Sequence, residues 1–313
     1  SRKKDIEKQT MKTLRFLCIT ASALSLAACS DREEGVSGPV AASVRADITT
    51  RATVNNTWAV GEDAIGVYAT SKGNTNESNV KYVASDQTGS FSPAGEPVYF
   101  ADSYDARFCA YYPYTDDAEI NADGTINWQG GIVKDGKCRW DFLFADGATA
   151  GKSSPVVNFS GDHAFRHCMA MVKFTVKAGY GIEYNETLLS FTLDKIQNEG
   201  TVNPRNGEMW SYASKTALTG TANQDLNDSP TVSFILLPQT VQNNSISVSL
   251  ETSTDDGTHN TYTTTLTAPS GGRFNGGSLY SYTIVVTNMG ITIENTGIQQ
   301  WQEGASSNFN IDA

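Results

Sequence analysis

Apolar and polar residues alternate with a period of two over much of this chain, and this pattern constrains its fold most. The segments 172–177, 245–250, 280–286 and 291–293 each place their apolar side chains on one face. Such alternation is typical of strands that bury one side. After residue 47, no stretch keeps apolar positions at helical spacing for three turns. The sequence therefore predicts an all-β protein with few helices.

Turn signals divide the chain into many short strands. Asp-Gly pairs at residues 123–124 and 256–257 lie between β-type segments, where this dipeptide is a strong hairpin signal. Many short strands at this spacing indicate β-sandwiches rather than a parallel sheet. One strongly patterned strand ends in glycines near residues 178–181. We therefore predict two sandwich domains in tandem, over residues 47–179 and 180–313.

The N-terminal region resembles an export signal that ends at Cys29. A short basic segment beginning at Met11 is followed by an apolar stretch, residues 16–28, which is shorter than the ~20 residues of a membrane-spanning helix. The signal closes as Leu-Ala-Ala-Cys, which resembles the bacterial lipobox, whose cysteine is lipidated. We predict that residues 1–28 are a signal peptide, with residues 1–10 preceding its true start, and that Cys29 carries the lipid. An ordinary signal peptide with an incidental cysteine is the alternative.

An acidic cluster follows the predicted lipid attachment site. Its members are Ser30, Asp31, Glu33 and Glu34. The cluster is similar to the acidic signal that sends lipoproteins of Bacteroidetes to the outer face of the outer membrane, and the alternative is a solvated tether. Residues 36–46 are small and polar, as in a linker. We therefore predict a lipidated tether over residues 29–46 and a surface-exposed outer-membrane lipoprotein.

The charge of the mature chain limits its partners. The whole chain has 23 basic and 34 acidic residues, of which residues 1–28 hold 6 and 2, so 17 and 32 remain, a net charge of −15. Such a body repels nucleic acid and anionic membrane surfaces. No other apolar stretch approaches the length of a membrane span. The lipid is therefore the predicted attachment to the outer membrane, and no nucleic-acid partner is predicted.

Three cysteines, Cys109, Cys138 and Cys168, lie in the predicted domains. They allow one disulfide at most, and an exported protein permits it. The alternative that we favour is three small buried apolar side chains. None has the Cys-x-x-Cys spacing of a metal or redox site.

The sequence offers little support for catalysis or metal binding. His163 and His167 are four residues apart, which in a strand means the same face but ~13 Å of separation, so we predict no zinc site. His167 is expected to be partly buried with its hydrogen bonds satisfied. No nucleophile elbow or phosphate-binding loop is present, and no motif identifies a glycosidase carboxylate pair. We predict no catalytic residue, no metal and no cofactor.

Several aromatic residues cluster in the first predicted domain. They are Tyr111, Tyr112, Tyr114, Trp128 and Trp140. A sugar-stacking platform is one interpretation, but a strand core explains them more simply.

Segments along the mature chain carry a family likeness in their order. They are residues 57–68, 91–95, 98–100, 108–114, 140–145, 165–170, 236–240, 277–283 and 298–301. Together they resemble the fimbrillin-like (Mfa-like) lipoproteins of Bacteroides and relatives. No single segment is specific, but their succession is.

The resemblance implies two transthyretin-like β-sandwich domains and a structural or adhesive subunit of type V pili. In that family a protease cuts after an arginine near the N-terminus and releases the first strand. The vacated groove then accepts a strand from the C-terminal region of the next subunit. The expected partners are therefore other fimbrial subunits, joined by β-strand addition, and a host or bacterial surface receptor is a further candidate partner.

The resemblance maps unevenly onto this chain. Arg45 and Arg51 are the candidate cut sites, although both could be ordinary linker arginines. The released strand would include residues 40–44, and the donor would come from residues 291–301 or 308–311. Because that tail is short, a tip or anchor subunit that is not cut and does not donate stays open. The alternative function is a surface lipoprotein that binds glycan without polymerising.

Overall fold

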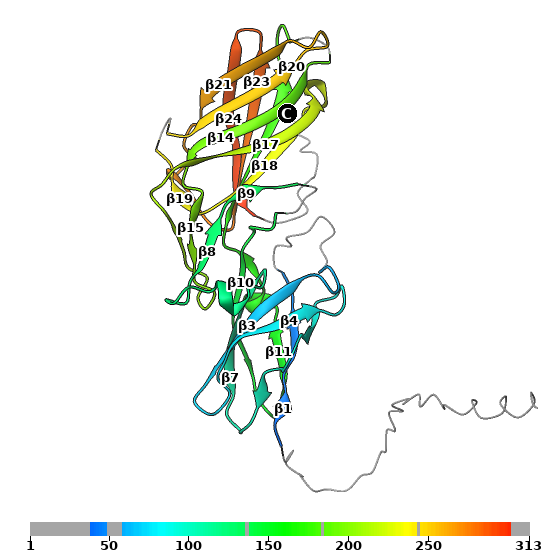
Figure 1. Ribbon diagram of the computed structural model, residues 1–313, viewed down its shortest axis with the longest axis vertical. Helices are drawn as coiled ribbons and strands as arrows, with labels where there is room; N and C mark the ends of the chain where they lie inside the picture. Colours follow the sequence, from blue (N-terminus) through cyan, green and yellow to red (C-terminus); the bar gives the residue numbers. More distant parts are fainter. Residues whose placement is uncertain (1–37, 49–57, 135–137, 183–184, 243–244, 302–313) are drawn as a thin grey trace, which may run out of the picture. The chain divides into compact units, whose positions relative to one another are not determined.

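The computed structural model describes residues 38–48, 58–134, 138–182, 185–242 and 245–301. The described residues from Gly38 onward belong to one unit by their mutual contacts, and Figure 1 shows their strands. The described residues form β-strands and three short 3-10 helices, namely η1 (Asp117–Glu119), η2 (Gly161–His163) and η3 (Leu226–Asp228). The all-β prediction is therefore confirmed. In the part of the chain described, no helix has the length and apolar character to span a membrane.

Eight strands of the N-terminal half form one sheet, in the order β11-β2-β5-β4-β3-β7-β10-β12. These strands are β2 (Ser43–Ala46), β3 (Ala64–Ser71), β4 (Glu77–Ala84), β5 (Ser90–Pro93), β7 (Ala106–Tyr112), β10 (Leu143–Ala150), β11 (Val156–Phe159) and β12 (Arg166–His167). A short pair joins β1 (Val40–Ala41) to β6 (Tyr99–Phe100). Phe159 in β11 and Phe165 beside β12 have ring centroids 5.8 Å apart, so the two ends of the sheet approach each other. The sheet thereby encloses a first apolar core.

The C-terminal half is a sandwich of two sheets. A five-stranded sheet has the order β24-β23-β13-β18-β9, and a four-stranded sheet has the order β17-β14-β20-β21. Their strands are β9 (Gly131–Ile132), β13 (Ala170–Ala178), β14 (Thr187–Ile196), β17 (Thr216–Asp225), β18 (Thr231–Leu236), β20 (Ser247–Ser253), β21 (His259–Thr265), β23 (Ser278–Thr287) and β24 (Gly290–Gln300). Phe174 of β13 and Phe191 of β14 meet at 4.6 Å between ring centroids, which places the two sheets face to face over a second core.

A third core, rich in aromatic residues, joins the two halves. It combines Tyr68 and Tyr111 of the N-terminal sheet with Ile235 of β18. Three short strands lie beside it, β8 (Ile126–Gln129), β15 (Glu199–Val202) and β16 (Met209–Ser211), and β19 (Gln239–Thr240) pairs with β22 (Arg273–Phe274). The ring of Phe142 stacks on Tyr111 at 5.8 Å and meets Trp128 at 5.4 Å. Tyr111 and Trp128 are thus core residues and not a sugar platform.

The structure corrects the predicted boundary at residue 179. Strand β13 pairs with β18 and β23 and belongs to the C-terminal sandwich, so the two halves divide before Ala170. Strand β9 also crosses this line, since it pairs with β18. The glycines at residues 179 and 181 form a turn that leads from β13 to β14 in the facing sheet. A turn inside one domain therefore carried the same sequence signal as a domain boundary.

The linker predicted over residues 36–46 is also wrong in its second part. Strands β1 and β2 lie there, and Ala42, Val44 and Ala46 are buried in the first core. Alanine contributes little to a hydrophobic pattern, so this alternation was hidden among small residues. The predicted tether is thus shorter than residues 29–46.

The two predicted Asp-Gly hairpins behave differently. Residues 256–257 form the turn of the β20–β21 hairpin, with Gly257 at a φ of +82°, as predicted. At residues 123–124, Gly124 also has a positive φ, but the preceding segment is the 3-10 helix η1. The two sides of this second turn are joined by a single antiparallel bridge, between Ile120 and Ile126, so they do not form a regular two-stranded hairpin.

Candidate functional site

Strand β2 occupies a position inside the N-terminal sheet. It pairs in parallel with β11 and antiparallel with β5. Val44 is 1% exposed, and burying a valine side chain contributes about 1.5–3 kcal/mol. Removal of β2 would leave unpaired edges on both neighbours and expose the core between them. Strand β2, the second strand of the described chain, is therefore integral to the eight-stranded sheet.

The two candidate cut sites differ in their surroundings. Arg45 lies within β2, where its backbone is opposite Asn158 of β11 and Ser90 of β5, although its side chain is exposed. It is therefore a strand residue and not a linker arginine. Arg51 lies outside the described residues.

Other predicted site residues also lie outside the described part of the chain. They are the lipid attachment residue Cys29, the acidic cluster of Ser30, Asp31, Glu33 and Glu34, and the tail at residues 308–311. These remain predictions from the sequence.

The candidate donor at residues 291–301 lies almost entirely in β24, at the edge of the five-stranded sheet. This strand pairs antiparallel with β23 from Gly290 to Gln300. Ile291 and Ile293 pack against the second core, whereas Ile298 is 42% exposed. The candidate donor is thus paired within its own chain, as an edge strand of the sheet that the described residues form.

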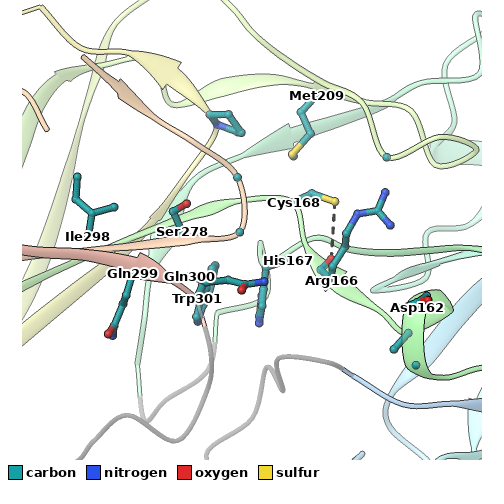
Figure 2. Close-up of a pocket in the computed structure, with 16 residues that line it drawn as sticks. Asp162, Arg166, His167, Cys168, Met209, Ser278, Ile298, Gln299, Gln300 and Trp301 are labelled. Atoms are coloured by element: carbon teal, nitrogen blue, oxygen red, sulfur yellow. Dashed lines mark hydrogen bonds between the residues drawn. The ribbon is translucent and has the colours of Figure 1, made fainter. Parts of the chain in front are cut away.

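The end of β24 is fixed by a stacked pair of rings. The Trp301 ring lies 3.7 Å from the His167 ring at an interplanar angle of 11°, and Trp301 is 3% exposed. The Trp301 backbone N–H also donates to the carbonyl oxygen of Gly277 at 2.7 Å. Figure 2 shows these rings beside a pocket of about 800 Å³, which Met209 also lines. Trp301, the last described residue, is thereby held at the junction of the two halves.

His167 is more deeply buried than the sequence predicted. Its Nδ1 lies 2.9 Å from Asp141 Oδ1, and the side chains of both residues are almost fully buried. Its Nε2 is also buried and has no hydrogen-bond partner among the residues that the structure describes. The expectation of a fully satisfied histidine is therefore only half right.

The two spaced histidines do not share a site. His163 Nδ1 lies 2.9 Å from the backbone oxygen of Asp146, while His167 contacts Asp141. Over the described ranges, no group of three His, Cys, Asp or Glu residues is arranged to hold a metal ion.

The three cysteines are free, so no two of them pair. Burial raises the pKa of Cys109 and of Cys138 to about 11 and that of Cys168 to about 12. All three thiols are therefore protonated near neutral pH, where a thiol is a weak nucleophile. Each is partly buried and packs against the third core.

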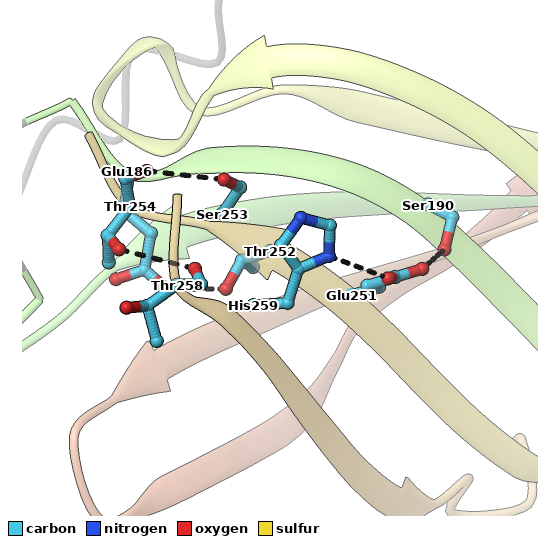
Figure 3. Close-up of polar contacts among 8 residues, drawn as sticks. All are labelled: Glu186, Ser190, Glu251, Thr252, Ser253, Thr254, Thr258 and His259. Carbon is cyan, nitrogen blue, oxygen red and sulfur yellow. Dashed lines mark hydrogen bonds and ion pairs between the residues drawn. The ribbon is translucent and has the colours of Figure 1, made fainter. Parts of the chain in front are cut away.

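Polar side chains form a second cluster on the four-stranded sheet (Figure 3). Buried Glu186 accepts a hydrogen bond from the Thr252 hydroxyl. Nearby, Ser190 Oγ donates to Glu251 at 3.4 Å, and His259 Nδ1 lies 3.1 Å from the same carboxylate. A serine triad needs the histidine between serine and carboxylate, whereas here the carboxylate lies between them. These contacts tie neighbouring strands together.

Sequence reasoning missed an exposed aromatic pair in β16 and just after it. Trp210 is 47% exposed and Tyr212 is 45% exposed. A pocket of about 450 Å³ lies beside Trp210 and is also lined by Lys195, Lys215 and Arg273. The signal available was two aromatic residues at period two in a short polar segment.

Comparisons with known proteins agree with this architecture. The sequence profile of the family described as fimbrillin-like matches residues 50–301, which cover both halves apart from β1 and β2. No curated protein sequence matches the chain.

Solved structures of bacterial surface proteins share the fold. A candidate cell adhesion protein from Bacteroides ovatus ATCC 8483 aligns with a TM-score of 0.66 and 24% identity, over 84% of this chain and 98% of that chain. Another, from Bacteroides uniformis ATCC 8492, has a TM-score of 0.62 and 22% identity, over 85% and 100%. A fimbrial protein from Bacteroides vulgatus ATCC 8482 has a TM-score of 0.50 and 14% identity, over 83% and 99%. At these identities the similarity establishes the fold.

Proposed function

This chain belongs to the fimbrillin-like family, and from that membership we propose that it is a structural or adhesive subunit of a surface fimbria. In this proposal it is exported as a lipoprotein anchored through Cys29 and is joined to a neighbouring subunit by β-strand addition. The outer membrane and other fimbrial subunits are its partners. Its role is mechanical rather than enzymatic, and the polar contacts around Glu251 support this because they link strands.

The observation that carries the proposal is the place of β2 in the N-terminal sheet. Ala42, Val44 and Ala46 fill the first core, and β5 and β11 bind the backbone of β2 on its two sides. A groove left by β2 would have apolar side chains and two unpaired backbone edges, which an alternating strand from another chain satisfies. A donor and an acceptor at different places on the subunit give an open filament.

We propose that maturation cuts after Arg51 rather than after Arg45. A protease binds its substrate as an exposed extended segment, whereas the backbone around Arg45 is paired on both sides. A cut after Arg45 would also divide β2 and leave Ala46 in the sheet. A cut after Arg51 leaves the whole of β2 on the released side.

The C-terminal strand favours a subunit that accepts a strand without donating one. Donation of β24 would break its pairing with β23 and expose Ile291, Ile293 and Trp301. Such a subunit fits an end of the filament, as a tip or an anchor.

The experiment treats the purified protein with an arginine-specific protease and then adds a labelled peptide of residues 40–48. We expect cleavage after Arg51 by mass spectrometry, followed by peptide binding to the trimmed protein only. Arg51→Ala should block both results, and the matched variant Arg45→Ala should block neither. Cleavage after Arg45, or a trimmed protein that fails to bind the peptide, would contradict the proposal. SDS-resistant ladders of the trimmed protein alone would contradict the accepting-only role.

A second candidate function is glycan binding without polymerisation. The exposed ring of Trp210 beside a pocket favours it, because small-molecule sites are concave and lined by aromatic side chains with a few polar groups. A protein of this kind stays monomeric after trimming and does not exchange its first strand.

A further inference from the structure

Positive charge gathers at one pocket of a strongly acidic protein. The chain has a net charge of −11, yet Lys195, Lys215 and Arg273 line the 450 Å³ pocket beside β16. None of the residues that line it is Asp or Glu. The lining of this pocket is therefore positively charged, whereas the chain as a whole is negatively charged.

These three cations are not neutralised by neighbouring carboxylates. The ion pairs within the described ranges involve other residues, such as Arg107 and Arg166 with Asp146. The acidic residue nearest in sequence is Asp194, whose carboxylate accepts a hydrogen bond from the backbone N–H of Lys195 at 2.7 Å. Like charges in one pocket repel, and a bound anion relieves that repulsion.

The backbone at Lys195 departs from a regular strand. Lys195 has a φ of +63°, which is uncommon for a residue other than glycine, and the register of β14 shifts between Leu193 and Ile196. A bulge of this kind re-aims a side chain away from the regular strand pattern. The fold thus holds a lysine at this pocket at some conformational cost.

The pocket also offers an aromatic face and neutral hydrogen-bonding groups. Trp210 lies in β16, an edge strand, and is 47% exposed. Among described residues, no aromatic ring stacks on it. Gln197, Gln242 and Ser211 line the same pocket and can hydrogen-bond to hydroxyl groups. A few polar groups around an apolar face are the usual composition of a small-molecule site.

We propose that this pocket binds an acidic saccharide. A sugar ring packs on Trp210, and its carboxylate or sulfate group lies among Lys195, Lys215 and Arg273. The acidic body of the protein repels a long polyanion such as nucleic acid, but much less a short glycan with one charge. This inference does not depend on polymerisation, so strand exchange and glycan binding can be measured separately on the same protein.

The test titrates the full-length protein with sialyllactose, sulfated lactose and lactose, which share a neutral core and differ in the acidic group. We expect at least one acidic probe to bind about tenfold more tightly than lactose, as for a hydrogen-bonded charge. The preferred probe distinguishes a carboxylated from a sulfated ligand. Added salt should weaken the binding, because it screens exposed charges.

Four variants locate the site. Trp210→Ala and Arg273→Ala should each weaken the acidic probe about tenfold. The matched controls Tyr180→Ala and Lys72→Ala remove an exposed aromatic and an exposed cation elsewhere and should leave binding unchanged. Equal affinity for lactose, binding that survives both pocket variants, or no binding of either acidic probe would overturn the proposal.

Discussion

Single residues fix the end of the C-terminal strand. Trp301 is the last residue described, and it is buried through its contacts with His167 and Gly277. The sequence identified Trp301 as the end of a family segment, and it predicted that His167 is partly buried. It gave no sign that the two rings stack, because their contact joins segments more than a hundred residues apart.

Truncation of Trp301 should therefore destabilise the protein strongly. Trp301→Ala removes a buried ring, which costs about 3–5 kcal/mol in well-packed sites. The matched control Ile298→Ala lies on the same strand but is 42% exposed, so its effect should stay below about 1 kcal/mol. Urea unfolding followed by circular dichroism measures both. Equal losses in the two variants would show that the stacked pair contributes little.

At the scale of elements, the strands with strong alternation were predictable and the weak ones were not. Strand β13 buries Val172, Phe174 and Val176 as predicted. The hydrophobic pattern did not predict β2, because its buried side chains are only Val44 and Ala46, and only the family resemblance implied a strand at residues 40–44. The sequence also did not predict which strands pair with each other. Strand β2 lies between β5 and β11, which begin 47 and 113 residues later in the chain.

The inward face of β2 can be tested by placing the same charge on its two sides. Val44→Asp puts a carboxylate into the first core and should lower the free energy of unfolding by about 3 kcal/mol or more. Arg45→Asp puts it on the exposed face and should cost less than about 1 kcal/mol. Thermal or urea unfolding of the two variants is the measurement. Similar losses would place β2 outside the sheet.

The whole molecule buries many tyrosines, and this gives it a characteristic response to alkaline pH. Burial raises the pKa of Tyr68 from 10.0 to about 12, and it also raises the pKa of Tyr111 and Tyr282. Above pH 10 the unfolded chain loses these protons while the folded protein keeps them. The stabilisation is therefore complete below about pH 10 and is lost as the pH rises through about 12.

We expect the free energy of unfolding to fall as the pH rises from about 10 towards about 12, and the tyrosinate absorbance to appear together with unfolding. Tyr68→Phe removes one titrating group and should flatten this fall. The control Tyr180→Phe, at a residue that is 86% exposed, should leave the slope unchanged. Identical slopes for both variants would mean that the buried tyrosines do not set the alkaline limit.

Two sandwich cores were predictable for the molecule as a whole, but their connection was not. Periodicity identifies which residues are buried, and it does not say which core receives them. The aromatic residues 111, 128 and 142 could have belonged to either half, and the structure shows them in a third core shared by both.

The parallel pairing of β2 with β11 has a mechanical consequence. If the proposed lipid at Cys29 anchors the chain, a pull on that anchor would load β2 from its N-terminal end, along the strand. Hydrogen bonds to β11 and β5 then bear the load together in shear, instead of opening one after another like a zipper. In the proposed lipid-anchored protein, β2 would therefore resist a pull from its N-terminal side, and a strand that replaced β2 would make hydrogen bonds to the same two neighbours.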